Sequence, residues 1–151
     1  MHFRAICQAR GLKATSQRIE ILKIVLGATN HPGVDDIYRK VKSRIPGISF
    51  DTVYRTLTSL EEHKLIARVH HLDDKARYDP ITREHYHFVC RACRQIVDFD
   101  WKEFTRLTLP STVRGLGRIE QKYVEIRGLC PKCSRTLPAR SPKVSGSQSR
   151  L

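Results

Sequence analysis

The chain has 151 residues, enough for one ordinary domain or two small ones, and its 28 Lys and Arg against 15 Asp and Glu give a formal net charge of +13. This surplus favours a polyanionic partner such as nucleic acid, although a merely soluble basic protein has the same balance. No run approaches the roughly 18 apolar residues that span a bilayer, and residues 1–10 show no secretory signal. We therefore expect a cytoplasmic protein.

Residues 10–72 predict helices followed by a short hairpin. The first helix can be capped by Thr15 or Ser16 and is expected to end near Gly27. After a break at residues 31–33, a second helix has Asp35 and Asp36 in its first turn, where the helix dipole favours acidic groups. Its apolar stripe at helical spacing consists of Val34, Ile37, Tyr38 and Val41.

A third helix is expected after a second break at residues 46–47, with Ser49 as its cap. Strands over 65–70 and 77–78 then surround the polar turn Asp73-Asp74-Lys75. Three helices and a two-stranded wing make a winged helix, whose third helix enters the major groove of DNA. We expect its apolar side to consist of Phe50, Val53, Leu57 and Leu60, and its outward side to carry Tyr54, Arg55 and Thr58.

The outward pair on this helix is suited to contact DNA. Arg55 could bind guanine or a phosphate, and Tyr54 could contact the backbone or a thymine methyl group. An ordinary exposed helix face is the alternative explanation of the same pattern.

Residues 85–133 predict a small α/β unit. Strands over 85–90 and 95–99 are followed by a short helix over 101–109 and a strand over 119–126. The helix is expected to turn Trp101, Phe104 and Leu107 or Leu109 inward. A structural zinc could offset so thin a core, and an open sheet edge would invite a second subunit.

Together these patterns predict an α+β fold in which an N-terminal winged-helix DNA-binding domain precedes a small C-terminal α/β dimerisation domain. The expected boundaries are 1–78 for the winged helix, 79–84 for a hinge, 85–134 for the metal-binding dimerisation domain and 135–151 for a tail. The tail is rich in Ser and Pro with basic residues and no acid, which predicts disorder and non-specific contact with DNA phosphates.

Two C-x-x-C pairs, Cys90 with Cys93 and Cys130 with Cys133, are separated by residues 94–129. Four thiolates in two such clamps are the usual ligands of a tetrahedral structural zinc. A pair of disulfides or buried thiols is the alternative, which a reducing compartment disfavours. Cys7 lies outside both clamps and is expected to be a small, partly buried helix residue without a redox role.

A second group of possible ligands surrounds the first clamp. His85 and His87 are two residues apart, so on a strand they point to the same face and can bind one ion. Asp79 and Asp98 flank them, and such a mixed nitrogen and oxygen set suits iron(II), manganese(II) or zinc. Two ordinary strand histidines are the alternative, because spacing alone does not show that the carboxylates converge.

A metalloenzyme built on these histidines is a further alternative. Val89 stands where an H-x-H-x-D motif needs Asp, and no nucleophile or Gly-rich phosphate loop follows at a suitable spacing. We therefore expect no enzymatic activity.

Five segments of the chain form a recognisable set. They are Gly11-Leu-Lys-Ala-Thr15 with Arg18, His31-Pro32 with Asp35-Asp36-Ile37-Tyr38, Ser49-Phe-Asp-Thr-Val-Tyr54-Arg55-Thr-Leu57, His85-Tyr-His87-Phe-Val-Cys90-Arg-Ala-Cys93, and Cys130-x-x-Cys133. Through these segments, over about residues 10–134, the chain resembles the ferric uptake regulator superfamily of dimeric metal-dependent repressors. Within it, the chain is most similar to the peroxide-responsive repressor branch, which has Ile-Val-Asp-Phe after the first clamp, here residues 96–99, where iron-uptake members usually carry Glu.

The resemblance implies a homodimer that represses transcription at an inverted-repeat operator in double-stranded DNA and senses hydrogen peroxide. It implies a regulatory iron or manganese ion held by His31, Asp79, His85, His87 and Asp98, beside the structural zinc. An ion bound there would hold the two domains in one relative orientation. In the iron form, peroxide would oxidise His31 or His85. The residues implied to contact DNA are Ser49, Thr52, Tyr54, Arg55, Lys13 and Arg18.

A regulator of iron, manganese or zinc uptake that does not sense peroxide is the alternative within this superfamily. Iron-uptake members often have an accessory metal site with a His before the last clamp; residues 120–123 contain none, which argues against that site here. His70 and His71 lie in the expected wing and are predicted to be near DNA rather than to bind metal.

Overall fold

The computed structural model describes residues 2–69, 76–119 and 124–136, and the chain divides into two compact units, Met1–Glu84 and His85–Leu151. The predictions for His70, His71, the turn at 73–75, residues 120–123 and the tail from 137 onward lie outside the described residues. Among the described helices, none is long and apolar enough to cross a membrane.

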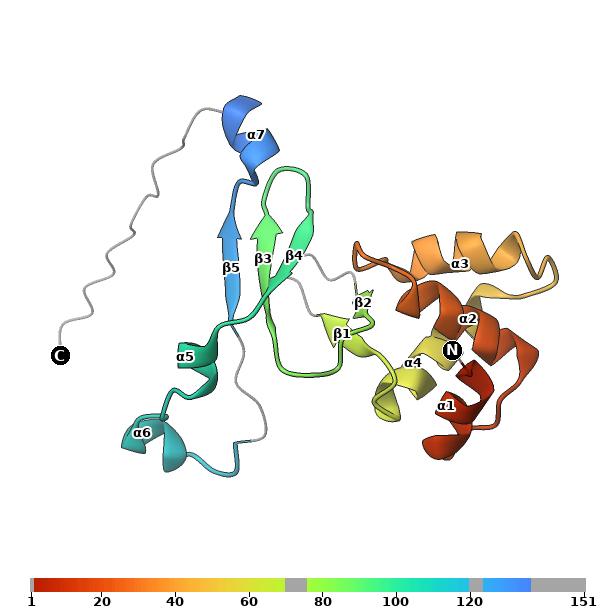
Figure 1. The fold of residues 1–151 in the computed structure, drawn as a ribbon, viewed down its shortest axis with the longest axis horizontal. Helices are drawn as coiled ribbons and strands as arrows, with labels where there is room; N and C mark the ends of the chain where they lie inside the picture. The colour runs from red at the N-terminus through yellow and green to blue at the C-terminus, as the bar shows by residue number, and fades with distance from the viewer. Residues whose placement is uncertain (1, 70–75, 120–123, 137–151) are drawn as a thin grey trace. The chain divides into compact units, whose positions relative to one another are not determined.

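The first unit contains four helices and a two-stranded sheet (Figure 1). The elements are α1 (Phe3–Ala9), α2 (Ser16–Leu26), α3 (Val34–Lys42), α4 (Phe50–Glu62), β1 (Ala67–Val69) and β2 (Arg77–Asp79). The prediction of three helices and a hairpin is confirmed for α2, α3, α4, β1 and β2. The sequence analysis did not define α1, which lies ahead of the predicted helical region.

Local capping explains where these helices begin. Thr15 Oγ1 accepts a hydrogen bond from the Arg18 N–H at 3.3 Å, and α2 starts at the next residue after Thr15. Ser49 Oγ accepts from the Thr52 N–H at 3.1 Å in the same way at α4. Both contacts satisfy donors that the first helical turn leaves without partners, so the predicted caps are confirmed.

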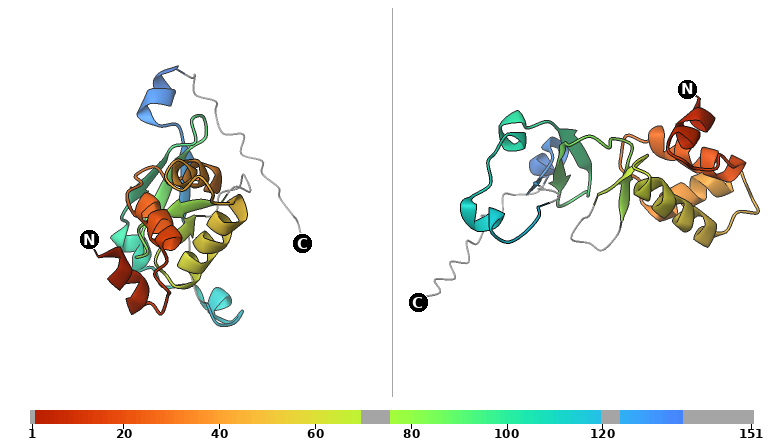
Figure 2. Two further views of the ribbon diagram at one scale, coloured as in Figure 1. Left: turned by 90° about the vertical axis from the view of Figure 1, so that its right-hand side faces the viewer. Right: turned by 90° about the horizontal axis from the view of Figure 1, so that it is seen from below.

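The three longer helices of this unit pack around one apolar core. Figure 2 shows the ribbon of these helices from two further directions. Cys7 of α1 is fully buried in it rather than partly buried as expected, and burial raises the pKa of its thiol. Phe50 was expected to face inward, but 41% of it is exposed; it packs edge-on against Tyr38, with ring centroids 5.4 Å apart. The core contributions of α2, α3 and α4 are Ile21, Leu22, Ile24, Val25, Ile37, Val41, Val53, Leu57 and Leu60.

The wing is joined to α4 through Arg68 of β1. Its Nε lies 3.0 Å from a carboxylate oxygen of Glu61, and its guanidinium lies 5.8 Å from the ring centroid of Tyr78. Arg68 and Tyr78 are register partners in the antiparallel pair, and the ring of Tyr78 is fully buried. This packing holds β2, the strand that ends at Asp79, against the helical core.

The second unit has a three-stranded sheet in the order β4–β3–β5. Its central strand β3 (Tyr86–Cys90) pairs antiparallel with β4 (Ile96–Phe99) and parallel with β5 (Glu125–Gly128). The described residues of this unit also form three short helices: α5 (Lys102–Thr105), α6 (Ser111–Arg114) and α7 (Pro131–Thr136). In Figure 1, α7 lies at one end of this sheet, and α5 and α6 lie toward the other.

Several expectations for the second unit were wrong in detail. Residues 101–109 form only the single turn α5, in which no residue is fully buried. Phe104 is half-buried against the ring of Tyr86, with ring centroids 5.2 Å apart, and Leu109 is also half-buried, whereas Trp101 and Leu107 are 40% and 53% exposed. The described part of the last strand starts at Glu125. Arg135 and Thr136 belong to α7 rather than to the tail, and neither α6 nor α7 was foreseen.

The core of the first unit supports a direct stability test. Leu57 of α4 is fully buried, so Leu57→Ala should lower the free energy of unfolding by about 2–5 kcal/mol through lost burial and the remaining cavity. The measurement is urea denaturation followed by helical circular dichroism. Leu116→Ala is the matched control, because Leu116 is 85% exposed. Equal midpoints for the two variants would contradict the packing described for α4.

Candidate metal centres

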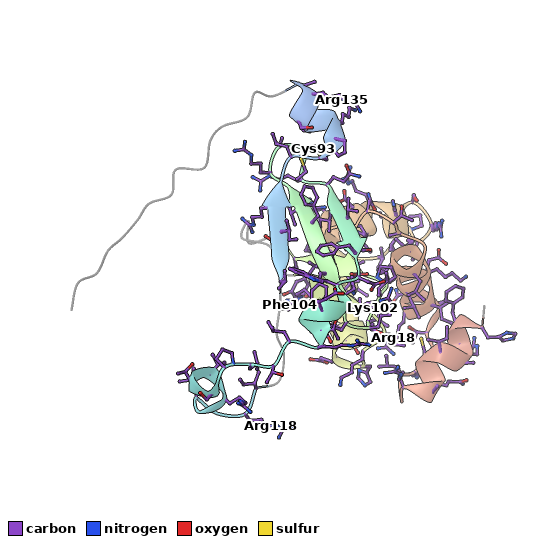
Figure 3. All side chains as sticks on the ribbon, turned by 60° about the vertical axis from the view of Figure 1, so that its left-hand side comes forward. Arg18, Cys93, Lys102, Phe104, Arg118 and Arg135 are labelled. Carbon is purple, nitrogen blue, oxygen red and sulfur yellow. The ribbon has the colours of Figure 1, made fainter. Side chains whose placement is uncertain are left out.

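The two C-x-x-C clamps converge in the second unit. Cys90 is the last residue of β3, and Cys93 lies in the turn before β4. Cys130 directly precedes α7, and Cys133 lies within it. The four Sγ atoms all lie within 4.8 Å of one another. Figure 3 shows Cys93 near Arg135 of α7, at the end of the sheet where the two clamps meet.

The spacing of the sulfur atoms fits a tetrahedral ion rather than disulfides. Four Zn–S bonds of about 2.3 Å place neighbouring sulfurs about 3.8 Å apart, whereas bonded sulfurs would be about 2.05 Å apart. The Cys93 and Cys130 Sγ atoms are 3.8 Å apart, and all five cysteines of the chain are free of disulfides. The residues present therefore fit a closed zinc site.

Cys90 and Cys133 differ in how readily their thiols lose a proton, because their surroundings shift the two pKa values in opposite directions. Backbone N–H groups of Cys93 and Cys130 lower the pKa of Cys90 to about 6, and one of these, from Cys130, donates to Cys90 Sγ at 3.3 Å. The neighbouring Cys130 sulfur raises the pKa of Cys133 to about 12. Binding an ion requires four thiolates, so it must displace the proton of Cys133, and affinity for the ion should fall as the pH falls.

The first half-site, which we define as His31 and Asp79, belongs to the first unit. His31 precedes α3, Asp79 ends β2, and His31 Nε2 lies 3.2 Å from Asp79 Oδ2. Both side chains are buried. The other carboxylate oxygen, Asp79 Oδ1, accepts a hydrogen bond from the Ile81 N–H at 2.7 Å, which fixes the orientation of the carboxylate.

The second half-site, which we define as His85, His87 and Asp98, belongs to the second unit. His87 and Asp98 are register partners on β3 and β4, with His87 Nε2 3.3 Å from Asp98 Oδ1. His85 Nε2 lies 3.9 Å from the same oxygen, and the two imidazole rings meet edge-on at 4.6 Å. His85 lies one residue before β3, so the three donor atoms come from the start of β3 and from its neighbour β4.

The geometry within each half-site fits a metal ion. With bonds of about 2.1 Å, two ligand atoms in neighbouring coordination positions lie about 3.0–3.4 Å apart. The 3.2 Å and 3.3 Å contacts fall in this range. Imidazole nitrogen and carboxylate oxygen together suit zinc, iron(II) or manganese(II).

Most residues expected to contact DNA surround the N-terminal half of α4. Tyr54 is 44% exposed, and Arg55 is open to solvent with Asp51 3.7 Å from its guanidinium. Ser49 and Thr52 are engaged with each other in the cap, their hydroxyl oxygens 2.8 Å apart. Lys13, before α2, is exposed. Arg18, in the first turn of α2, is half-buried, and its guanidinium donates a hydrogen bond to the Lys13 carbonyl.

Sequence reasoning missed Arg77. Its Nη1 donates to the carbonyl oxygen of His31 at 3.2 Å, 46 residues away in the chain. The only available signal was its position two residues before Asp79, which places both side chains on the same face of β2.

Comparison with known proteins settles the family. Residues 9–112 match the model of the ferric uptake regulator family. The chain belongs to this family. The resemblance stated from the sequence motifs is therefore confirmed, and so is the expected combination of helices and sheet.

Members of the ferric uptake regulator family that resemble this chain include peroxide regulators. The peroxide operon regulator of Bacillus subtilis (strain 168) is 33% identical over 126 residues, which cover 83% of this chain and 86% of that protein. The crystal structure of the Campylobacter jejuni peroxide stress regulator is 32% identical, with a TM-score of 0.63, and covers 88% of this chain and 100% of that one. The ferric uptake regulator of Francisella tularensis, solved with iron, is 26% identical, with a TM-score of 0.69, and covers 82% and 95%.

The sulfur cluster can be tested by substitution. Cys93→Ser should lower the zinc content measured on purified protein well below one ion per chain, because three thiolates leave the tetrahedral site open. Cys7→Ala is the matched control and should keep its zinc, since Cys7 lies in the core of the first unit. Full zinc retention by Cys93→Ser would remove Cys93 from the ligand set.

Proposed function

We propose that this member of the ferric uptake regulator family is a dimeric, metal-dependent transcriptional repressor that senses hydrogen peroxide. The observation that carries the proposal is the pair of half-sites: each offers imidazole and carboxylate atoms at the separation of neighbouring ligands on one ion. The peroxide regulators among its relatives support the same function.

In this proposal one regulatory iron(II) or manganese(II) ion takes ligands from both half-sites, and a separate zinc takes Cys90, Cys93, Cys130 and Cys133. The first half-site belongs to the same compact unit as α4, and the second belongs to the other unit. An ion bound by His31, Asp79, His85, His87 and Asp98 therefore restricts how the units move relative to each other. That restriction favours the dimer conformation that binds DNA.

Peroxide reverses this state by damaging a ligand. A bound iron(II) ion would promote cleavage of the O–O bond of hydrogen peroxide. In sum the imidazole ring of His31 or His85 gives up two electrons and gains one oxygen atom at a ring carbon, and the other oxygen of the peroxide leaves as water. The oxidised ring is a poorer ligand, so the ion is released and repression ends.

DNA binding is assigned to α4 of each protomer, with Tyr54 and Arg55 as the readers. Ser49 and Thr52 position the start of α4, while Lys13, just before α2, and Arg18, in its first turn, are assigned to DNA phosphates. A two-fold dimer predicts an inverted-repeat operator with half-sites about one helical turn, or a multiple of it, apart. A chain that acts on an operator in this way is expected in the cytoplasm and is expected to have no enzymatic activity.

A regulator that senses only the metal is the second candidate, favoured by the iron in the structure of the Francisella tularensis relative. Both candidates use the same ligands and the same operator geometry. They differ in whether peroxide releases DNA from the iron form.

Substitution of Arg55 tests whether its side chain recognises a base in the operator. Its exposed ion pair with Asp51 contributes at most about 1 kcal/mol, so the guanidinium can reorient toward a base. Arg55→Ala should weaken operator binding by about 1–3 kcal/mol, measured at fixed salt. Arg127→Ala removes a charged residue from β5 of the second unit and serves as the control. Unchanged operator affinity in Arg55→Ala would exclude Arg55 as a reader.

The peroxide mechanism predicts where oxygen is added. In the iron form, peroxide should add one oxygen to a peptide that contains His31 or His85, in step with the loss of operator binding. The manganese form should bind DNA but resist peroxide, because manganese(II) reacts poorly with it. Mass spectrometry and DNA-binding assays on the same samples make the measurement.

Three other outcomes would argue against this mechanism. Equal sensitivity of the manganese form would exclude chemistry that depends on iron. Oxidation confined to Cys7 or the four clustered cysteines would indicate a thiol switch. An iron form that keeps its operator in peroxide would favour the regulator that senses only the metal.

A further inference from the structure

The backbone of His31 adopts a conformation that a histidine seldom takes. Its φ is 47°, in the left-handed region, although it is not a glycine. It also precedes Pro32, and residues before proline prefer extended conformations. Such a conformation persists only where surrounding contacts maintain it.

Strand β2 supplies them from within the same unit. Arg77 Nη1 donates to the His31 carbonyl at 3.2 Å, and the Tyr78 N–H donates to the Pro32 carbonyl at 3.0 Å. Gly33 forms an isolated antiparallel bridge with Arg77. The segment 31–33 is therefore attached along β2, and the side chain of Arg77 holds the residue whose backbone is strained.

The same strand also contacts the ring of His31. Arg77 and Asp79 are two residues apart on β2, so their side chains project to one face. Arg77 contacts the His31 carbonyl, and Asp79 Oδ2 lies 3.2 Å from His31 Nε2. One face of one strand thus fixes both the main chain and the imidazole of His31.

We propose that Arg77 is a positioning residue for the regulatory metal: it keeps His31 in the left-handed conformation that presents Nε2 beside Asp79. This inference rests on the proposed function of the first half-site. Without the guanidinium, His31 can relax toward the extended conformations that precede proline, and the two ligand atoms separate. The ion must then supply the free energy that reorders them, so its affinity falls.

The experiment compares Arg77→Met, which removes the donor, with Arg77→Lys, which restores a cationic donor of similar length. Manganese(II) is titrated into the full-length zinc-loaded dimer in a metal-buffered solution. Arg77→Met should weaken manganese binding roughly tenfold, the effect of one hydrogen bond with a charged donor, and Arg77→Lys should recover most of it. Arg39→Met is the matched control, because Arg39 on α3 is exposed and pairs with Asp36.

A second measurement is made without the regulatory ion. Imidazole nitrogen NMR of the manganese-free dimer should show His31 in a single hydrogen-bonded environment in the wild type and in Arg39→Met, and in exchange between environments in Arg77→Met. Zinc content and melting temperature should match between Arg77→Met and Arg39→Met. These readouts separate positioning of His31 from a general loss of structure.

Unchanged manganese affinity in Arg77→Met overturns the proposal. So does loss of zinc or of cooperative folding in that variant, since Arg77 would then belong to the fold rather than to the half-site. His31→Ala and Asp79→Ala test the proposed function separately. If neither weakens manganese binding, the regulatory site is wrong and this inference falls with it; if both do while Arg77→Met does not, only this inference is overturned.

Discussion

The convergence of the two cysteine clamps is the constraint on which the second unit depends. Its described residues bury only a small apolar set around β3, whereas the first unit has an extensive core shared by its helices. The sulfur cluster joins the β3–β4 turn to the chain that enters α7, two places that little apolar packing connects. Zinc binding supplies about 10–16 kcal/mol in zinc-finger peptides, enough to compensate for so small a core.

The proposed ion between the two half-sites could supply the free energy that the regulatory step requires. Moving a two-state repressor from about 99:1 to 1:99 takes roughly 5.5 kcal/mol of differential binding. A surface ion pair such as that of Arg55 with Asp51 contributes about 0–1 kcal/mol and cannot drive this change. The regulatory ion that we propose, with five ligands drawn from two units, would do so, because it would bind well only in an arrangement that brings both half-sites together.

The sequence predicted best those features that depend on residues close together in the chain. Caps at Thr15 and Ser49, the C-x-x-C clamps and the His85-x-His87 pair all act within a few residues, and they were found where expected. The exposure of Trp101 could not be predicted, because an apolar residue at helical spacing gives no information on whether a surface exists to cover it. The role of Arg77 could not be predicted either, because its partner His31 is 46 residues away in the chain. The left-handed backbone conformation of His31, which Arg77 supports, also leaves no signal in the sequence.

The ligand chemistry separates the two metal functions that we propose. Zinc(II) has no redox chemistry, and four thiolates enclose it, so it can hold the second unit together in the presence of an oxidant. Imidazole and carboxylate ligands suit ions that can react with peroxide. Because the half-sites share no residue with the sulfur cluster, the proposed oxidation of His31 or His85 would remove the regulatory ion and leave the zinc ligands intact. The folded dimer would then remain after the signal, and only its attachment to DNA would be lost.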